Sequence, residues 1–268
     1  MNETEAARRD RLRAETMARR REILAGLEAT EGSKAITLIH RKEPWADEDD
    51  HITVEDSEFV LMQIRHTPPG RPIDLILHTP GGLALASEMI ALALKGHAAR
   101  VRVIVPFYAM SGGTLIALAA DEVLMEPYSI LGPVDPQIAG MPATALLRVV
   151  QQKPLHAIDD KTLILADTAR LAVQGVKAFV GWLLADRMPA AKAAEVADLL
   201  TGGYITHDTP LTMAVAQNLG LNVRPGIPPA VYDLFSTCAF GVCKRPCLAQ
   251  YDGPGVAPEA PTHRPSWE

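Results

Sequence analysis

Mostly aliphatic runs of five residues alternate with longer stretches of helical periodicity through the first half of the chain. The aliphatic runs predict buried strands at 35–39, 73–77 and 101–105. Apolar residues at helical spacing follow each run and predict helices at 57–66, 83–95 and 114–120. Because strands and helices alternate at this spacing, we expect an α/β fold of right-handed βαβ units around a largely parallel sheet.

The second half of the chain is predicted to be mainly helical. Its expected elements are short strands at 122–125 and 129–131, then helices at 142–153, 163–184 and 190–200. The first of these helices has Pro142 in its first turn and ends before Pro154. Proline and glycine recur from Asn222 onwards, which is typical of an extended arm or a disordered tail.

The N-terminal segment predicts a helix in which charges of both signs surround a thin apolar stripe. Such a helix is not stable alone, so we expect it to pack on a partner chain or on the surface of the domain. Membrane-surface binding is the less favoured alternative, because the polar face is mixed rather than basic. The expected division is an N-terminal helix over 1–32, a main domain over 33–221 and a C-terminal arm or tail over 222–268.

Composition supports one large domain with appendages. The chain has 268 residues, of which 48% are hydrophobic and only 5% aromatic, and this favours an α/β interior over a β-sandwich. The net charge of −6 implies no general affinity for nucleic acid. The absence of an apolar run of about eighteen residues predicts no transmembrane span. Charges occupy the N-terminus where a signal peptide would need an apolar core, so a cytoplasmic location is expected.

The three cysteines all lie in the late segment, at Cys238, Cys243 and Cys247. With one further ligand they could hold zinc, but the spacing lacks the usual pair separated by two residues, so reduced thiols are the favoured interpretation. We expect no metal and no cofactor.

Ser111 is the first candidate for chemistry. It follows a predicted strand and precedes Gly112, Gly113 and a predicted helix. A serine at a helix entrance is exposed and near free backbone amides. Taken alone, it is better explained as a helix N-cap. Ala109 stands where an α/β-hydrolase nucleophile elbow would have its first glycine.

A second glycine-bearing turn changes that balance. Gly81 and Gly82 end one buried strand and open a helix, and paired glycines let backbone amides approach a ligand closely. The turn should lie one strand away from Ser111, at the carboxyl edge of a parallel sheet, where open α/β sheets place their sites. A nucleophile beside an amide pair is what acyl transfer requires. A plain tight turn is the alternative.

The base that such a serine needs is harder to place. Four histidines (His78, His97, His156 and His207) lie in no run that fixes them. Lys153 ends the helix that begins at Pro142, and Leu146, Val149 and Val150 share its helical face. If that face is buried, desolvation lowers the pKa of the amine and makes it a usable base. A solvated cation at the helix C-terminus is the equally weighted alternative.

Four motifs resemble the Clp-fold serine proteases, and the closest resemblance is to the branch called serine dehydrogenase proteinases. This branch is related to signal peptide peptidase A and to archaeal membrane-associated Ser–Lys proteases. The motifs occur in order at 78–82, 109–114, 119–122 and 131–136, within a resemblance that spans about 33–221.

The resemblance implies a Clp/crotonase fold of stacked ββα units. It makes Ser111 the nucleophile and the Gly81, Gly82 and Gly112 amides the oxyanion-hole candidates. In the Ser–Lys members the lysine follows the serine by some forty residues, and Lys153 follows Ser111 by 42. The Ser–His–Asp members have a histidine about twenty-five residues after the serine, where this chain has none between residues 132 and 137.

The expected function is therefore an ATP-independent serine endopeptidase that cleaves peptides or unfolded proteins through a Ser–Lys dyad and an acyl-enzyme. It is expected to form a homo-oligomer, without a nucleic acid partner and with no indication of membrane association. One alternative is a crotonase-like acyl-CoA enzyme with Glu88 and Asp135 as its acidic residues. Another is a non-catalytic oligomeric scaffold. Dehydrogenation carries little weight, because no Gly-x-Gly-x-x-Gly motif occurs.

Overall fold

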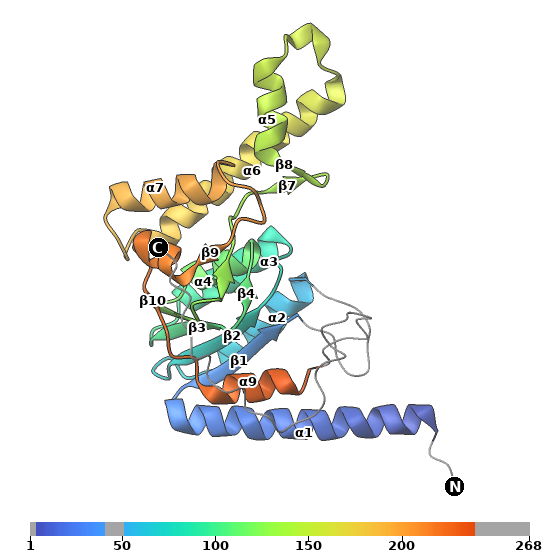
Figure 1. Cartoon of the computed structure of the whole chain (residues 1–268), viewed down its shortest axis with the longest axis vertical. Coiled ribbons are helices and arrows are strands. Elements are labelled where there is room, and N and C mark those ends of the chain that lie inside the picture. The colour runs from blue at the N-terminus through green and yellow to red at the C-terminus, as the bar shows by residue number, and fades with distance from the viewer. Residues whose placement is uncertain (1–3, 41–50, 239–268) are drawn as a thin grey trace, which may run out of the picture.

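A parallel five-stranded sheet forms the centre of the computed structural model, which describes residues 4–40 and 51–238 (Figure 1). The strand order is β1-β2-β3-β5-β10, and every neighbouring pair is parallel. The strands are β1 (Lys34–Ile39), β2 (Ile73–His78), β3 (Val101–Val105), β5 (Glu122–Met125) and β10 (Val223–Arg224). The α/β class and the parallel sheet predicted from the sequence are confirmed.

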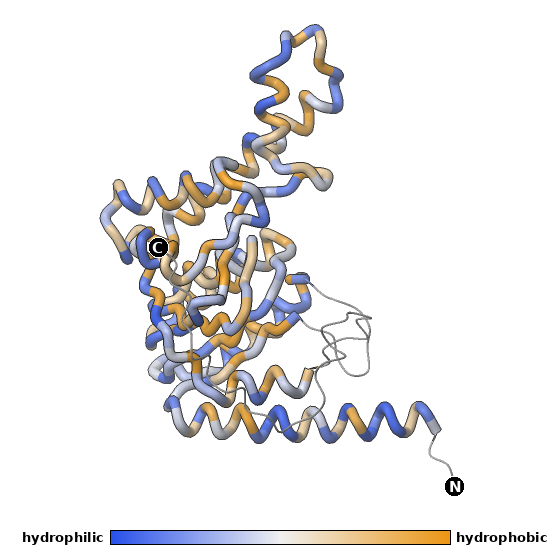
Figure 2. The backbone as a smooth tube through the Cα atoms, in the orientation of Figure 1, coloured by the Kyte–Doolittle hydropathy of each residue, from blue (hydrophilic) through white to orange (hydrophobic). Residues whose placement is uncertain are grey.

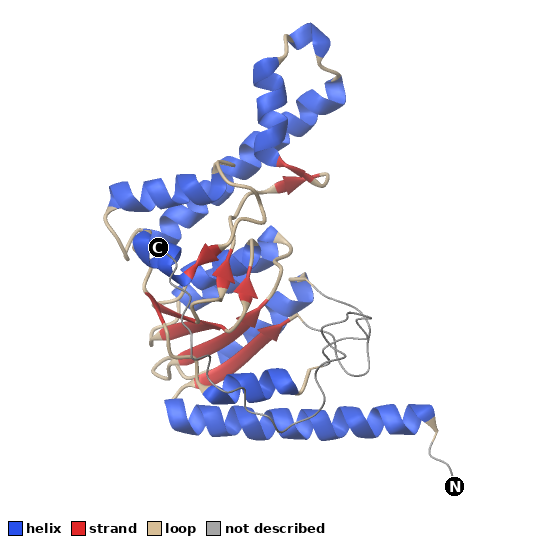
Figure 3. Ribbon diagram, viewed as in Figure 1, coloured by secondary structure: helices blue, strands red, loops and turns tan. Residues whose placement is uncertain are grey.

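Helices cover both faces of this sheet (Figure 3). Alternate residues of a strand point to opposite faces, so Leu75 and Val103 pack in one core, while Ile76 and Ile104 pack in the other. The larger core includes side chains from α2 (Val54–His66), α3 (Ala84–Lys95), α4 (Gly112–Leu118), α6 (Asp160–Leu184), α7 (Ala190–Thr201) and α8 (Met213–Asn218). The smaller core lies under α1 (Glu5–Glu31) and α9 (Pro229–Ser236).

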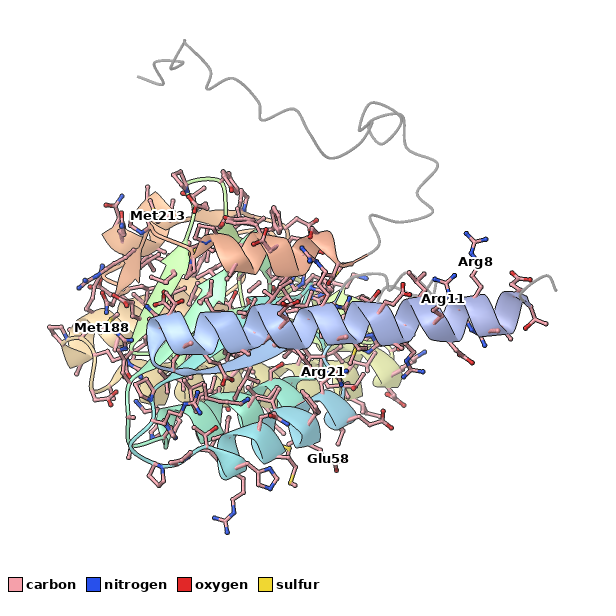
Figure 4. The ribbon with its side chains drawn as sticks, turned by 90° about the horizontal axis from the view of Figure 1, so that it is seen from below. Arg8, Arg11, Arg21, Glu58, Met188 and Met213 are labelled. Carbon is pink, nitrogen blue, oxygen red and sulfur yellow. The ribbon has the colours of Figure 1, made fainter. Side chains whose placement is uncertain are left out.

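The long helix α1 contacts the domain through its second half. Leu27 is buried in the smaller core, and Ile23 and Leu24 pack against that core. Figure 4 shows the first half extending past the body of the domain, with Arg8 and Arg11 on that part. Figure 2 shows hydrophilic colour over much of α1. The helix therefore packs on the domain surface, one of the two arrangements predicted.

One buried ion pair fixes the end of α1 to the sheet. Asp74 interrupts the apolar pattern of β2 and is fully buried. It accepts hydrogen bonds from Arg102 Nε on β3 at 2.7 Å and from Ser33 Oγ at 2.6 Å. Arg102 Nη2 also donates to Glu31 Oε2, at the end of α1, at 2.7 Å. These charge-assisted bonds compensate the cost of burying a carboxylate among strands.

The C-terminal arm does not begin where the sequence predicted. Residues 223–224 form β10 at the edge of the main sheet, and α9 buries Val231, Leu234 and Phe235 under α1. The folded domain thus continues at least to Cys238 instead of stopping at residue 221. The short strand and the proline-initiated helix do not stand out among the prolines and glycines of this segment. The acidic segment 43–50 and most of the predicted tail lie outside the described residues.

A small second sheet lies beside the carboxyl ends of the main strands. Its order is β4-β6-β9, with β4 (Tyr108–Ala109) parallel to β6 (Ile130–Leu131) and β9 (Leu211–Thr212) antiparallel to β6. Ala109 is paired with Leu131, and Leu131 with Leu211, so the three residues lie in one row.

A helical hairpin projects from the body of the domain (Figure 1). It consists of α5 (Ala143–Gln152), the 3-10 turn at Leu155–Ala157 and the first part of α6. It follows the two-stranded hairpin of β7 (Gln137–Ile138) and β8 (Met141–Pro142). Ala143, Leu146 and Ala169 form a small separate core between α5 and α6. The buried face of α5 therefore packs on α6 and not on the sheet.

No helix within residues 4–40 and 51–238 has the length and apolar content needed to cross a membrane. The cytoplasmic location stays a prediction.

Candidate active site

Ser111 occupies a strained turn between β4 and α4. Its backbone has φ 51° and ψ −114°, a left-handed conformation that non-glycine residues rarely adopt. Ser111 stands at the N-cap position of α4, but its side chain makes no capping hydrogen bond. The helix-cap explanation is thus not realised. A strained backbone that caps nothing is characteristic of a functional position.

Gly81 lies against the serine turn. A Cβ atom added to Gly81 would stand 2.8 Å from Ser111 Cβ and 3.0 Å from the Met110 carbonyl oxygen, and its φ is 111°. Only glycine fits there. The Gly81 N–H is already used, because it donates to Thr79 Oγ1 at 3.1 Å. Gly81 therefore serves close packing against the serine turn, and its amide already has a partner; its predicted place in an oxyanion hole stays a prediction.

The backbone around Gly82 is hydrogen-bonded on one side and open on the other. Ile52 lies alongside it as a parallel bridge, with Ile52 N–H donating to the Gly81 carbonyl at 2.8 Å and Leu83 N–H donating to the Ile52 carbonyl at 2.9 Å. In an extended segment successive amides face opposite sides, so the Gly82 N–H points away from Ile52. It donates to no partner among the described residues.

Gly112 supplies the second amide. As the first residue of α4 its N–H has no partner within the helix, and no hydrogen bond of the described residues uses it. A Cβ atom at Gly112 would stand 2.2 Å from Ser87 Oγ on α3. Of the three glycines predicted for the oxyanion hole, Gly82 and Gly112 have amides that no hydrogen bond among the described residues uses, and both line the cavity with Ser111.

Ser111, Gly82 and Gly112 line a cavity of about 460 Å³. Its walls are mainly apolar and come from α3, α4, α6 and the segment after β6, including Leu83, Leu115, Val134, Ala172 and Val176. Two acidic residues, Glu88 and Asp135, also line it. Burial raises the pKa of Glu88 above its usual value. An apolar cavity with convergent amides suits the side chain of an extended peptide.

Asp135 is held by two polar neighbours. Its side chain is 4% exposed, and it accepts hydrogen bonds from His207 Nδ1 at 2.6 Å and from Gln137 Nε2 at 2.9 Å. From the sequence, Asp135 was a candidate only for an acyl-CoA enzyme, and His207 lay in no pattern that fixed its position. Strand β9 begins four residues after His207 and places it near Asp135. This strand has only two residues, which is too short to show a strand pattern in the sequence.

Lys153 lies apart from the cavity. It follows the last residue of α5 on the projecting hairpin, its side chain is exposed, and it does not line the cavity around Ser111. Of the two alternatives that the sequence left open, the structure has the solvated lysine at the helix C-terminus and not the buried amine. Its catalytic role stays a prediction.

The other histidines have structural surroundings. His78 is buried against the rings of Phe107, Tyr108 and Phe235. His97 Nε2 lies 2.8 Å from the Arg71 carbonyl oxygen, and His156 is exposed on the hairpin.

The described part of the chain contains no group of three or more His, Cys, Asp or Glu side chains that could hold a metal ion. Cys238 is half-buried and accepts a hydrogen bond from Arg20. Cys243 and Cys247 lie outside the described residues, so the zinc alternative is not tested.

Comparison with known proteins identifies relatives over most of this chain. The profile of a family described as ClpP-like SDH-type serine proteinase matches residues 8–259. An uncharacterized protein of Methanocaldococcus jannaschii is 50% identical over 219 residues, which are 80% of this chain and 77% of the relative. A second one from the same organism is 49% identical over 212 residues, 78% and 72% of the two chains.

A solved structure, a serine-to-alanine mutant of the membrane-bound stomatin-specific protease 1510-N, is also similar. It is 18% identical, with a TM-score of 0.45, over 76% of this chain and 81% of that one.

Proposed function

From the premise that this chain belongs to the family of ClpP-like SDH-type serine proteinases, we propose that it is an ATP-independent endopeptidase that cleaves peptides or unfolded proteins. The observation that carries the proposal is Ser111, a strained residue whose side chain makes no capping bond. It lines an apolar cavity with Gly82 and Gly112, whose amides bond to no partner within residues 4–40 and 51–238. Nucleophile, oxyanion donors and a pocket are the parts that acyl transfer needs.

In the proposed reaction Ser111 Oγ attacks a peptide carbonyl. The carbonyl oxygen becomes an oxyanion that accepts hydrogen bonds from the N–H groups of Gly82 and Gly112. Departure of the amine leaves an acyl-enzyme on Ser111, and water then hydrolyses it. A single amide of this kind typically contributes about 3–4 kcal/mol of transition-state stabilisation.

Lys153 is the base that the family resemblance implies. Because Lys153 is exposed on the hairpin, a Ser–Lys dyad within one chain requires the hairpin to fold back over the cavity, and otherwise the lysine must come from a second copy. The Ser–Lys dyad therefore requires a movement of the hairpin or a second copy of the chain, whereas the role of Ser111 as nucleophile requires neither.

The test is cleavage of casein and of short peptides, together with labelling by a fluorophosphonate probe. Wild type should cleave and be labelled, and Ser111→Ala should do neither. Ser236→Ala is the control, because Ser236 lies at the end of α9 and donates to the Asp233 carbonyl, outside the cavity. Cleavage by Ser111→Ala at the wild-type rate would sink the proposal. Lys153→Ala tests the dyad separately.

We also propose that the protein forms a homo-oligomer. The projecting hairpin and α6 carry large apolar side chains in water, among them Leu155 (70% exposed), Ile164 (67%) and Leu171 (56%). A second copy of this chain would remove them from solvent, which stabilises association.

A further inference from the structure

We propose that His207, oriented by Asp135, is the general base for Ser111. This inference rests on the proposed role of Ser111 as the nucleophile. It names a different residue from Lys153, on a segment outside the projecting hairpin.

The sheet formed by β4, β6 and β9 brings Ser111, Asp135 and His207 to the same end of its strands. Ser111 comes two residues after β4, and Asp135 comes four residues after β6, which runs parallel to β4. His207 comes four residues before β9, which runs antiparallel to β6. Since Ala109, Leu131 and Leu211 lie in one row, the segments that carry the three residues leave the sheet at the same edge.

Hydrogen bonds hold two of these segments together. Thr114 Oγ1 on α4 accepts from the Gly132 N–H at 3.0 Å and lies 2.9 Å from both the Ala109 and the Gly132 carbonyl oxygens. The segment after β6 is thus attached to the helix that Ser111 opens. Asp135, at the end of that segment, lines the same cavity as Ser111.

The pairing of His207 with Asp135 defines which imidazole nitrogen is available. A carboxylate only accepts hydrogen bonds, so His207 Nδ1 must donate the proton of the 2.6 Å bond to Asp135 Oδ1. In the neutral ring Nε2 then carries the lone pair, which is the form a general base requires. The Asp135 side chain is 4% exposed and the His207 side chain is 34% exposed, so the carboxylate is buried while part of the ring stays accessible. Asp135 lines the cavity around Ser111, and His207 stands directly behind it in the hydrogen-bonded pair.

In the proposed reaction His207 Nε2 accepts and returns each proton that is transferred. As Ser111 Oγ bonds to the carbonyl carbon, its proton passes to His207 Nε2, and the carbonyl π electrons move to the oxygen. When the carbon–nitrogen bond breaks, the departing amine takes that proton from His207. A water molecule then attacks the acyl-enzyme and gives one proton to Nε2. Cleavage of the Oγ–carbon bond returns this proton to Ser111 and releases the acid.

The charges around His207 favour this assignment. Asp135 is the charged side chain that contacts it within the described residues, and Asp208 is its charged neighbour in the same segment. Both are acidic, and an adjacent carboxylate stabilises the imidazolium that forms during attack. Glu88 lines the cavity around Ser111.

The experiment measures the rate of fluorophosphonate labelling of Ser111 as a function of pH in the full-length chain. In wild type the rate should fall toward acidic pH, because a protonated imidazole cannot accept the serine proton. In His207→Gln the rate should be about 10²–10⁴-fold lower and should lose this acidic limb. Asp135→Asn should also be slow, and the double variant should be no slower than His207→Gln, because residues that act as a unit are not additive. His156→Gln is the matched control, since His156 is exposed on the hairpin.

A merely structural histidine would give a different pattern. Labelling of His207→Gln at the wild-type rate, with the acidic limb intact and Ser111→Ala unlabelled, would overturn the assignment and leave the peptidase proposal standing. If His207→Gln melts at a lower temperature, Asp135→Asn takes its place, and an unchanged pH profile in that variant counts against the pair. Absence of labelling in wild type would overturn both proposals.

Discussion

Replacing Ser111 by glycine should stabilise the fold while abolishing activity. At φ 51° and ψ −114° a residue with a Cβ atom pays a backbone strain of about 1–3 kcal/mol, whereas glycine pays almost none. Against this, glycine gains about 0.5–1 kcal/mol of conformational freedom in the unfolded chain. The balance predicts that Ser111→Gly is more stable than Ser111→Ala by up to about 2 kcal/mol.

The measurement is urea denaturation of wild type and both variants, with thermal melting as a second probe. For a domain of this size 1 kcal/mol corresponds to about 2–4 °C in melting temperature. Neither variant should react with the fluorophosphonate, so the two differ only in backbone freedom. If Ser111→Gly is instead less stable than Ser111→Ala by the usual cost of glycine, no strain is stored at this turn. The strongest structural reason for regarding Ser111 as the nucleophile then disappears.

Four further predictions test other parts of the structure. Gly112→Ala should lower both labelling and stability, because the added Cβ would stand 2.2 Å from Ser87 Oγ. Adding Ser87→Ala should restore part of the lost stability, and no recovery in unfolding experiments would contradict this contact. Burial raises the pKa of Glu88, so the folded state loses stability as the pH rises from the pKa of an ordinary carboxyl group through the raised pKa of Glu88. Glu88→Gln should therefore stabilise the protein at pH 7 and change its stability little at pH 4, as measured by urea denaturation at both pH values. Asp74→Ala leaves a buried guanidinium without its main partner and should destabilise by about 3–5 kcal/mol, whereas a loss below 1 kcal/mol would show that the ion pair is not important for folding. Leu155→Glu should lower the mass seen by analytical ultracentrifugation, because a charge would be buried in the proposed contact; an unchanged mass would place the contact elsewhere.

The sequence predicted the parts of the fold that have a clear period. Strands β1, β2 and β3 and the helices between them lie within a few residues of their predicted positions, because long apolar runs leave few alternatives. Strands β9 and β10 have two residues each, and their existence depends on neighbours brought in from elsewhere in the chain. Missing β10 and α9 put the predicted domain end at residue 221 instead of beyond Ser236.

The residues of the candidate site also differ in how well the sequence could indicate them. Ser111, Gly82 and Gly112 could be named from the sequence because their turns directly follow strong strand patterns, and the structure brings them to one cavity. Whether Lys153 is buried could not be decided from the sequence. The pattern of an amphipathic helix predicts that one face is covered, but it does not say which element covers it, and the partner of α5 is α6. The contact between Asp135 and His207 spans 72 positions, a separation over which local patterns carry no information.

The hairpin of α5 and α6 is a modular insertion in the sense used in protein engineering. Its own core is limited to Ala143, Leu146, Ala169 and a few partly buried neighbours, whereas the cavity takes its wall from Ala172 onwards. A shortened chain that joins the start of α5 to the middle of α6 would delete the exposed apolar tip and Lys153 together and leave the Ser111 turn in place. The proposed assembly surface and the cavity around Ser111 therefore lie largely in separable segments, so a mutation in the hairpin would leave most of the cavity wall unchanged.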